Sequence, residues 1–216
     1  MLNMQSFDAF IESGADSDIT VAGFFKERRG VAVNDDKLKE HIASALARGW
    51  PEHPWERPHN GRALICGAGP SMADPSTLKK IRRLANRKNN HVSTVNKTET
   101  HFLSLGRQGL GANIKSDFHV LIDPKEIVKT YVTPQRGTDY FIASQCHPSV
   151  LDVFAPDKFT KFLYHHGAAG DGLDGKSHTT PPLFSTVGGE SILVLYRLGF
   201  RKFELFGMES SYADDK

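Results

Sequence analysis

The sequence has few cysteines, no long apolar run and almost no excess charge. Its only two cysteines, Cys66 and Cys146, are too few for a disulfide framework and lack metal-ligand spacing. No apolar run approaches the length of a membrane span, and residues 1–14 lack the apolar core of a signal peptide. We therefore expect a reducing, cytoplasmic setting and no membrane partner.

The net charge of +2 gives no strong electrostatic preference for nucleic acid, so a nucleic-acid partner is not expected. Hydrophobic residues make up 39% and charged residues 24% of the chain, as in ordinary globular proteins. The 216 residues suffice for one α/β domain with an N-terminal extension. The basic residues between 79 and 88 fit a solvated helix face better than a polyanion site.

The chain divides near residue 60. Residues 1–60 predict a helical extension, with one apolar helix face at Phe7, Phe10 and Ile11 and a second helix from the N-cap Asn34 to about Gly49. Residues 50–59 contain three prolines, which exclude helix and sheet and indicate a surface linker. Residues 61–216 alternate apolar strands with helices. Strands are expected at 63–66, 91–95, 118–122, 140–143, 162–164 and 202–206, and helices at 75–87, 99–108 and 188–199. This alternation predicts an α/β fold with a doubly wound, mostly parallel sheet.

A glycine turn follows the first of these strands. Gly67, Gly69, Pro70 and Ser71 lie between the buried run and the next helix, where backbone N–H groups can meet a phosphate. The turn does not complete the dinucleotide fingerprint and has no Walker lysine, so a P-loop hydrolase is excluded. Taken alone, it is as consistent with a tight turn that binds no ligand.

Polar side chains follow every predicted strand, and ligands of open α/β sheets bind at this edge. We expect these groups to converge on one crevice, although each also has a structural explanation as a cap or turn residue. The groups are Gly67, Gly69 and Ser71; Asn96 and Lys97; Asp123; Ser144, Gln145 and His147; His165 and His166; Glu209 and Ser210.

The pattern predicts phosphate chemistry. The glycine turn and the helix start at Thr186, Gly188 and Gly189 offer N–H groups and a hydroxyl to anions, and Lys97 can neutralise a phosphate. Asp123 and Glu209 are oxygen ligands suited to Mg²⁺. His147 ranks above His165 and His166 as an acid–base residue because a dense polar cluster surrounds it.

Several segments together resemble the MptE-like family, named for an archaeal 6-hydroxymethyl-7,8-dihydropterin pyrophosphokinase. They are the glycine turn, residues 95–97, 117–124, 143–148 and 186–189, and the closing run 198–212, so the resemblance covers residues 60–212. The family is distantly similar to motility accessory factors and to sialyltransferase-type glycosyltransferases, which share the Gly-x-Gly-Pro-Ser turn and a following asparagine. The resemblance implies a Rossmann-like fold and transfer of diphosphate from ATP to a hydroxymethyl acceptor, with Mg²⁺.

On this basis the candidate catalytic residues are Asp123, His147 and Asn96, and the metal ligands are Asp123 and Glu209. The nucleotide-binding candidates are Gly67, Gly69, Pro70, Ser71, Asn96, Lys97, Ser144, Gln145, Thr186, Gly188 and Gly189. Two features depart from the family: Glu209 stands where it has aspartate, and family members continue beyond the position of Lys216, so a fragment is expected. The alternatives to a diphosphokinase are a glycosyltransferase using a CMP-activated sugar and a nucleotide-binding module without catalysis.

Overall fold

A six-stranded parallel sheet forms the centre of the computed structural model, which describes residues 33, 35–107, 114–155, 157–165 and 186–209. The strands lie in the order β5-β4-β3-β2-β1-β6, and every neighbouring pair is parallel. Their bounds are β1 Arg62–Cys66, β2 Asn90–Val95, β3 Phe118–Leu121, β4 Asp139–Ala143, β5 Thr160–Tyr164 and β6 Lys202–Phe206. The predicted Rossmann-like α/β fold is confirmed, and each predicted strand is present.

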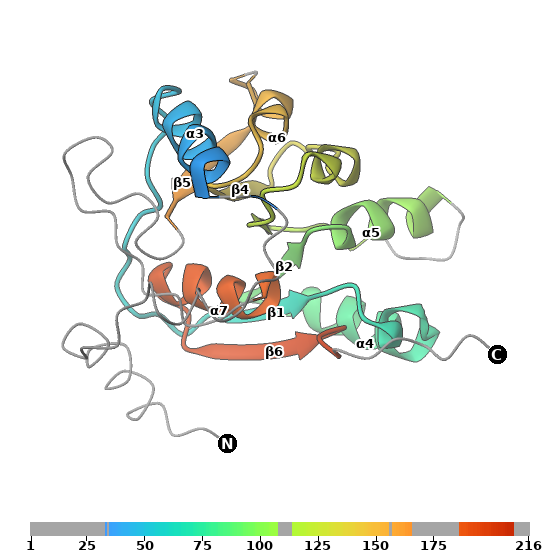
Figure 1. The fold of residues 1–216 in the computed structure, drawn as a ribbon. Helices are drawn as coiled ribbons and strands as arrows, with labels where there is room; N and C mark the ends of the chain where they lie inside the picture. Colours follow the sequence, from blue (N-terminus) through green and yellow to red (C-terminus); the bar gives the residue numbers. More distant parts are fainter. Residues whose placement is uncertain (1–32, 34, 108–113, 156, 166–185, 210–216) are drawn as a thin grey trace.

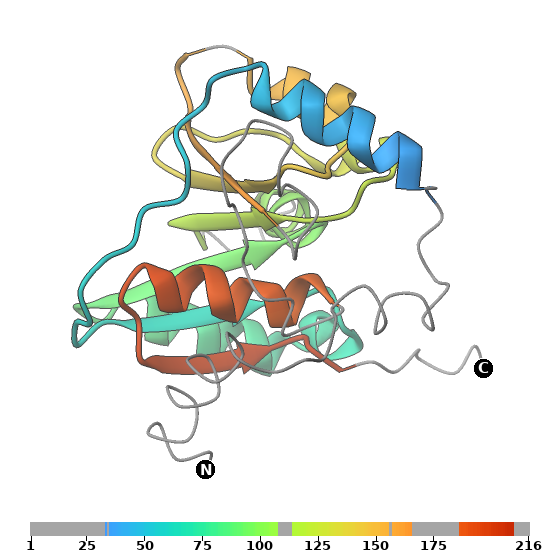
Figure 2. The ribbon, with the colours of Figure 1, turned by 60° about the vertical axis from the view of Figure 1, so that its left-hand side comes forward.

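Helices cover both faces of the sheet (Figures 1 and 2). Helices α4 (Pro75–Ala85) and α5 (Thr98–Arg107) lie on one side and α7 (Val187–Arg197) on the other. The side chains of β1 divide between two cores: Leu64 packs with α4, and Ile65 packs with α7. Burial on both faces explains why the strands appear in the sequence as continuous apolar runs.

Polar side chains fix where these helices begin. Asp74 caps α4 by accepting a hydrogen bond from the Ser76 N–H at 2.9 Å, and Pro75 occupies the first turn, where its missing N–H costs nothing. Thr186 caps α7 by accepting from the Gly189 N–H. The basic residues of α4 are exposed, as expected for a solvated helix face.

The N-terminal segment that the structure describes packs onto the sheet domain. Helix α3 (Asp35–Leu46) contributes Ala45 to the larger core, and Trp50 packs partly against it. The proline-rich segment forms no helix, but Glu52 makes one parallel bridge to Leu163 of β5. Trp55 is 66% exposed. The helix expected at residues 7–11 lies outside the described residues.

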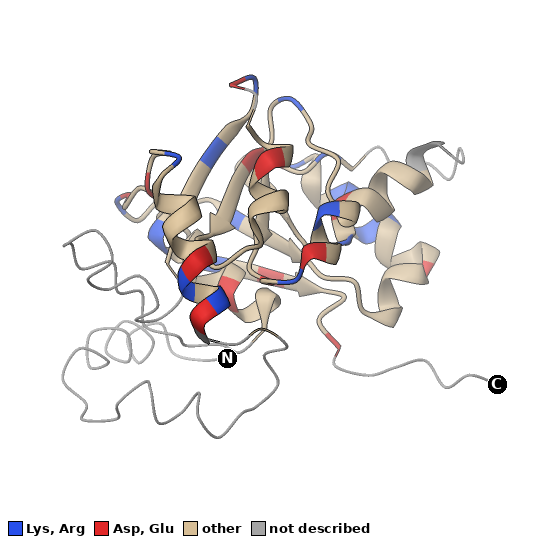
Figure 3. Ribbon diagram, turned by 45° about the horizontal axis from the view of Figure 1, so that its top comes forward, with Lys and Arg blue, Asp and Glu red and all other residues tan. Residues whose placement is uncertain are grey.

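The structure contains three short helical turns that the sequence analysis did not predict. They are η1 (Pro70–Ala73), η2 (Glu126–Tyr131) and α6 (Pro148–Val153). Each is too short to display the 3.6-residue apolar period on which helix prediction depends. The acidic and basic residues of α3 lie in its N-terminal half (Figure 3). No helix within the described ranges combines the length and the apolar character of a membrane span.

Candidate functional site

The carboxyl ends of the strands form a row and do not converge on one point. Adjacent strands lie about 4.8 Å apart, so the ends of β5 and β6 are separated by five such steps. We divide the row into a glycine-turn half (residues 67–73, 96–104 and 207–209) and a histidine half (His41 with residues 122–123 and 144–147). The expectation of a single crevice is therefore wrong, because the sheet order keeps the two groups apart.

The glycine turn packs against the end of β6. The Gly67 N–H donates to the Phe206 carbonyl and the Gly69 N–H to the Gly207 carbonyl, both at 2.8 Å. A Cβ at Gly67 or Gly69 would lie less than 3.0 Å from the Gly207 carbonyl oxygen. These glycines are required for a close approach of two backbones. Their N–H groups were expected to point toward a phosphate, but they bond to carbonyl groups of the chain.

Glu209, which follows β6, packs against the glycine turn. Its carboxylate oxygen is close to Gly69, where an added Cβ would collide with it. Hydrogen bonds from the Ser71 hydroxyl, and then from the N–H groups of Glu209 and Ser71, lower the pKa of the Glu209 carboxyl. Ser71, which was predicted to bind a phosphate, thus already donates a hydrogen bond to a carboxylate of the chain.

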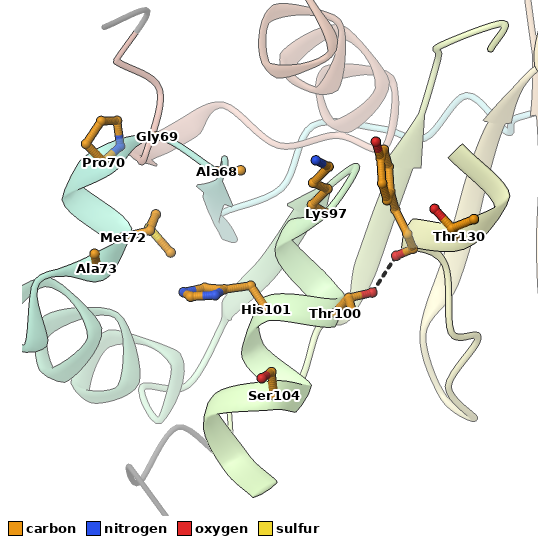
Figure 4. Close-up of a pocket in the computed structure, with 11 residues that line it drawn as sticks. Ala68, Gly69, Pro70, Met72, Ala73, Lys97, Thr100, His101, Ser104 and Thr130 are labelled. Atoms are coloured by element: carbon orange, nitrogen blue, oxygen red, sulfur yellow. Dashed lines mark hydrogen bonds between the residues drawn. The ribbon is translucent and has the colours of Figure 1, made fainter. Parts of the chain in front are cut away.

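A cavity of about 490 Å³ opens beside the glycine turn, between η1, α5 and η2 (Figure 4). One wall is apolar, and the opposite wall is a polar stripe on α5 at helical spacing. In Figure 4 the His101 side chain extends from α5 toward Met72 and Ala73. The His101 Nε2 atom is buried and has no hydrogen-bond partner among the described residues. The lining residues are Ala68, Gly69, Pro70, Met72, Ala73, Lys97, Thr100, His101, Ser104, Thr130 and Tyr131.

Contacts between α5 and η2 shape the mouth of this cavity. The Lys97 ammonium lies over the Tyr131 ring, 4.3 Å from its centroid. The Thr100 hydroxyl donates to the Tyr131 carbonyl, the dashed contact in Figure 4. The structure thus brings Lys97 together with the glycine turn, as predicted, and adds Tyr131, which the sequence analysis missed because η2 has no motif.

Asn96 adopts a left-handed backbone conformation, with φ of 46°. Its Oδ1 atom is buried and has no partner within the described part of the chain. Asn96 does not line the cavity beside it. Left-handed residues other than glycine are uncommon, and they often mark sites where function tolerates strain.

In the histidine half, backbone contacts occupy two of the predicted polar groups. The Asp123 carboxylate accepts from the Lys125 N–H at 3.0 Å, and the Gln145 amide donates to the Ile122 carbonyl at 2.9 Å. The Ser144 side chain is fully buried, and its Oγ has no partner among the described residues. His166 and Ser210 lie outside the described residues, and His165 is buried.

The N-terminus of α7 is capped from within. Its Gly189 N–H donates to Thr186 Oγ1 at 3.2 Å, so this N–H is not directed at a ligand. A Cβ at Gly188 would lie 2.5 Å from the Met208 sulfur. Gly188 therefore packs against a flexible side chain that follows β6, and its predicted role in binding a phosphate stays a prediction.

The donor set fits a shared Mg²⁺ ion poorly. Asp123 follows β3 and Glu209 follows β6, with β2 and β1 between them, so their strand ends lie roughly 14 Å apart. No group of three or more His, Cys, Asp or Glu side chains suited to a metal occurs in the described ranges. The strand order thus separates the two predicted ligands, and a Mg²⁺ site at Asp123 and Glu209 stays a prediction.

A buried polar network lies between α5 and strands β2, β3 and β4. Glu99 is 3% exposed, and its carboxylate accepts a hydrogen bond from the Tyr140 hydroxyl of β4 at 3.2 Å. Burial raises the pKa of Glu99 from 4.5 to about 7. His119, also fully buried, bonds Thr94 through Nδ1 at 2.7 Å, and burial lowers its pKa to about 3.

His41 is the one candidate in the histidine half that comes from outside the sheet domain. It extends from α3, and its ring lies edge-to-face with His147, with the centroids 4.9 Å apart. His147 caps α6 by accepting the Ser149 N–H. No motif surrounds His41 in the sequence, so only the packing of α3 reveals it.

No family model and no curated protein matches the sequence. Among solved structures, the fold is similar to "Structure of MAf glycosyltransferase from Magnetospirillum magneticum AMB-1", with a TM-score of 0.61 and 17% identity. The match covers 86% of this chain but only 29% of the neighbour. The fold thus agrees with the expected distant similarity to motility accessory factors, whereas the MptE-like assignment is not confirmed.

Proposed function

We propose that this chain is the nucleotide-binding part of a transferase whose donor is a CMP-activated sugar. The observation that carries the proposal is the cavity beside the glycine turn, at the carboxyl ends of β1 and β2. Ligands of open α/β sheets bind at this edge. A volume of about 490 Å³ is in the range of small-molecule sites.

The two walls of the cavity suit a nucleoside. Pro70, Met72 and Ala73 provide an apolar surface for a flat base, and the polar side chains of α5 line the opposite wall, where they can bond to the edge of the base. Lys97, at the mouth, supplies positive charge for the phosphate.

Two observations favour a sugar nucleotide over ATP with Mg²⁺. Diphosphate transfer from ATP would require carboxylates gathered around the metal, whereas Asp123 and Glu209 lie at strand ends that β1 and β2 separate. The structural neighbour is, by its name, a glycosyltransferase. Transfer of diphosphate from ATP to a hydroxymethyl acceptor remains the second candidate, supported by the sequence motifs.

A thermal-shift panel of CMP, CTP, ATP and GTP, each with and without Mg²⁺, tests the proposal. We expect CMP to raise the melting temperature without Mg²⁺, since a ligand at 100 times its Kd adds about 2.7 kcal/mol to the unfolding free energy. Lys97→Ala should weaken CMP binding about tenfold, and the exposed Lys79→Ala on α4 serves as the charge-matched control. Stabilisation by ATP and Mg²⁺ but not by CMP would favour the diphosphokinase.

A further inference from the structure

Two histidine rings from distant parts of the sequence meet at the end of β4. His41 lies in α3 and His147 begins α6; these helices lie side by side in Figures 1 and 2. An ion pair between Arg48, just after α3, and Asp152 of α6 has an N–O distance of 2.6 Å and joins the same two regions. The contact of the two rings, with centroids 4.9 Å apart, is therefore fixed by packing from both sides.

The hydrogen bond of His41 determines its neutral tautomer. Its Nδ1 lies 3.1 Å from the Gln145 carbonyl oxygen. A carbonyl only accepts, so Nδ1 carries the proton and Nε2 carries the lone pair. No hydrogen bond to Nε2 is found in the part of the chain that the structure describes. The residue as a whole is 7% exposed, and its Nε2 is not among the fully buried atoms, so a small molecule can reach this nitrogen.

The neutral tautomer of His147 is the opposite one. The Ser149 backbone N–H, which cannot rotate away, points at His147 Nδ1 at 3.2 Å. Nδ1 must therefore accept, and the proton of the neutral ring lies on Nε2. This tautomer makes His147 a hydrogen-bond donor, so of the two acid–base roles predicted for this residue it suits the acid better than the base.

A lone pair on one Nε2 and an N–H on the other form a complementary pair for a hydroxyl group. A hydroxyl donates one hydrogen bond and accepts another. Its oxygen would lie about 2.7–3.2 Å from each nitrogen, which rings at this separation allow. The phosphodiester of a CMP-activated sugar carries no proton to donate, so it fits the pair less well.

We propose that His41 and His147 bind the acceptor hydroxyl of the transfer reaction, with His41 as the base. The inference rests on the proposed function. The hydroxyl oxygen attacks the anomeric carbon of the CMP-activated sugar, and its proton passes to His41 Nε2. The bond between the anomeric carbon and the phosphate oxygen breaks, and CMP leaves with that electron pair. His147 Nε2–H holds the attacking oxygen in place.

The position of the two histidines suits separate binding sites for the donor and the acceptor. The ends of β2 and β4 lie two strand spacings apart, roughly 10 Å. A nucleotide seated in the cavity beside α5 would direct its sugar along the strand ends toward this pair. The donor would then occupy the glycine-turn half and the acceptor the histidine half.

Long-range ¹H–¹⁵N NMR correlation of the labelled full chain near pH 8 reads the tautomers directly, without any ligand. Spectra of His41→Gln and His147→Asn assign the signals. We expect a protonated Nδ1 for His41 and a protonated Nε2 for His147. The same tautomer at both residues would overturn the proposal, whatever the nucleotide panel shows.

Release of CMP from a CMP-activated sugar, with glycerol as the acceptor, tests the catalytic part. Loss of a general base should lower kcat about 100-fold in His41→Gln and leave the Kd for CMP within twofold. His147→Asn, which keeps a capping side chain, should lower it about tenfold. His91→Gln, near the amino end of β2 and away from the carboxyl ends of the strands, is the control. CMP binding with equal turnover in His41→Gln and His91→Gln would overturn this inference alone, whereas absence of CMP binding in the wild type would overturn the proposed function as well.

Discussion

The two halves of the carboxyl edge are held together in different ways. In the glycine-turn half, backbone meets backbone, and the absence of side chains at Gly67, Gly69 and Gly207 permits the contact. In the histidine half, the His41 side chain of α3 determines the arrangement through contacts with the segment between β4 and α6. A glycine pattern is visible in a sequence, whereas a meeting of distant side chains is not.

The substitution with the largest expected effect breaks the backbone contact of the glycine-turn half. In Gly67→Ala the new Cβ would collide with the Gly207 carbonyl, an atom that no side-chain rotation can move. We expect the unfolding free energy to fall by about 3 kcal/mol, at the upper end for overpacking. Urea denaturation followed by circular dichroism measures this loss.

Gly49→Ala is the matched control for that substitution. Gly49 has φ of 61° but nothing within 4 Å of an added Cβ, so it tests backbone strain without a collision. We expect a loss of about 1 kcal/mol. Equal losses at the two positions would mean that the approach of β1 to β6 is not tight.

The next effect concerns the buried network between α5 and the strands. Since burial raises the pKa of Glu99 to about 7, the native protein keeps a proton there that the unfolded chain releases above pH 4.5. The contribution of Glu99 to stability is therefore complete below pH 4.5 and is lost as the pH rises through 7. We expect the unfolding free energy of the wild type to fall by about 3 kcal/mol between pH 4.5 and about 7 because of Glu99. Glu99→Gln should not show this fall.

Urea midpoints of the wild type and Glu99→Gln, measured from pH 4.5 to 8, test this prediction. The lowered pKa of His119 acts in the opposite direction in acid, where stability is lost as the pH falls below 6.5. The difference between the two proteins isolates Glu99. The exposed Glu40→Gln is the control, and parallel curves for wild type and Glu99→Gln would contradict the prediction.

The smallest effect separates two roles of His147. In His147→Ala the Ser149 N–H loses its partner, which should cost about 1 kcal/mol of unfolding free energy. His147→Asn should recover most of this, because asparagine is a good N-cap. Asp74→Ala, which removes the cap of α4, gives a comparison of the same size. A full loss in His147→Asn would show that the imidazole, beyond its capping nitrogen, stabilises the fold.

Much of the fold was predictable from the sequence, because strands buried on both faces leave apolar runs such as residues 63–66. The order of the strands was not, and that order separates Asp123 from Glu209. The glycine turn was placed correctly, but the reason for its glycines is the approach of Gly207. His41 left no signal, because its role depends on where α3 packs.

The contact between Gly67 and Gly207 also bears on the order in which the protein is made. The first strand of the sheet domain emerges from the ribosome early, yet the last strand supplies the carbonyls that receive the N–H groups of its turn. Contacts between such distant segments cost loop-closure entropy and form slowly. The nascent chain therefore carries an unfinished glycine-turn half until β6 has been synthesised and docked. On the proposed function, binding of a nucleotide would report that the whole sheet is complete.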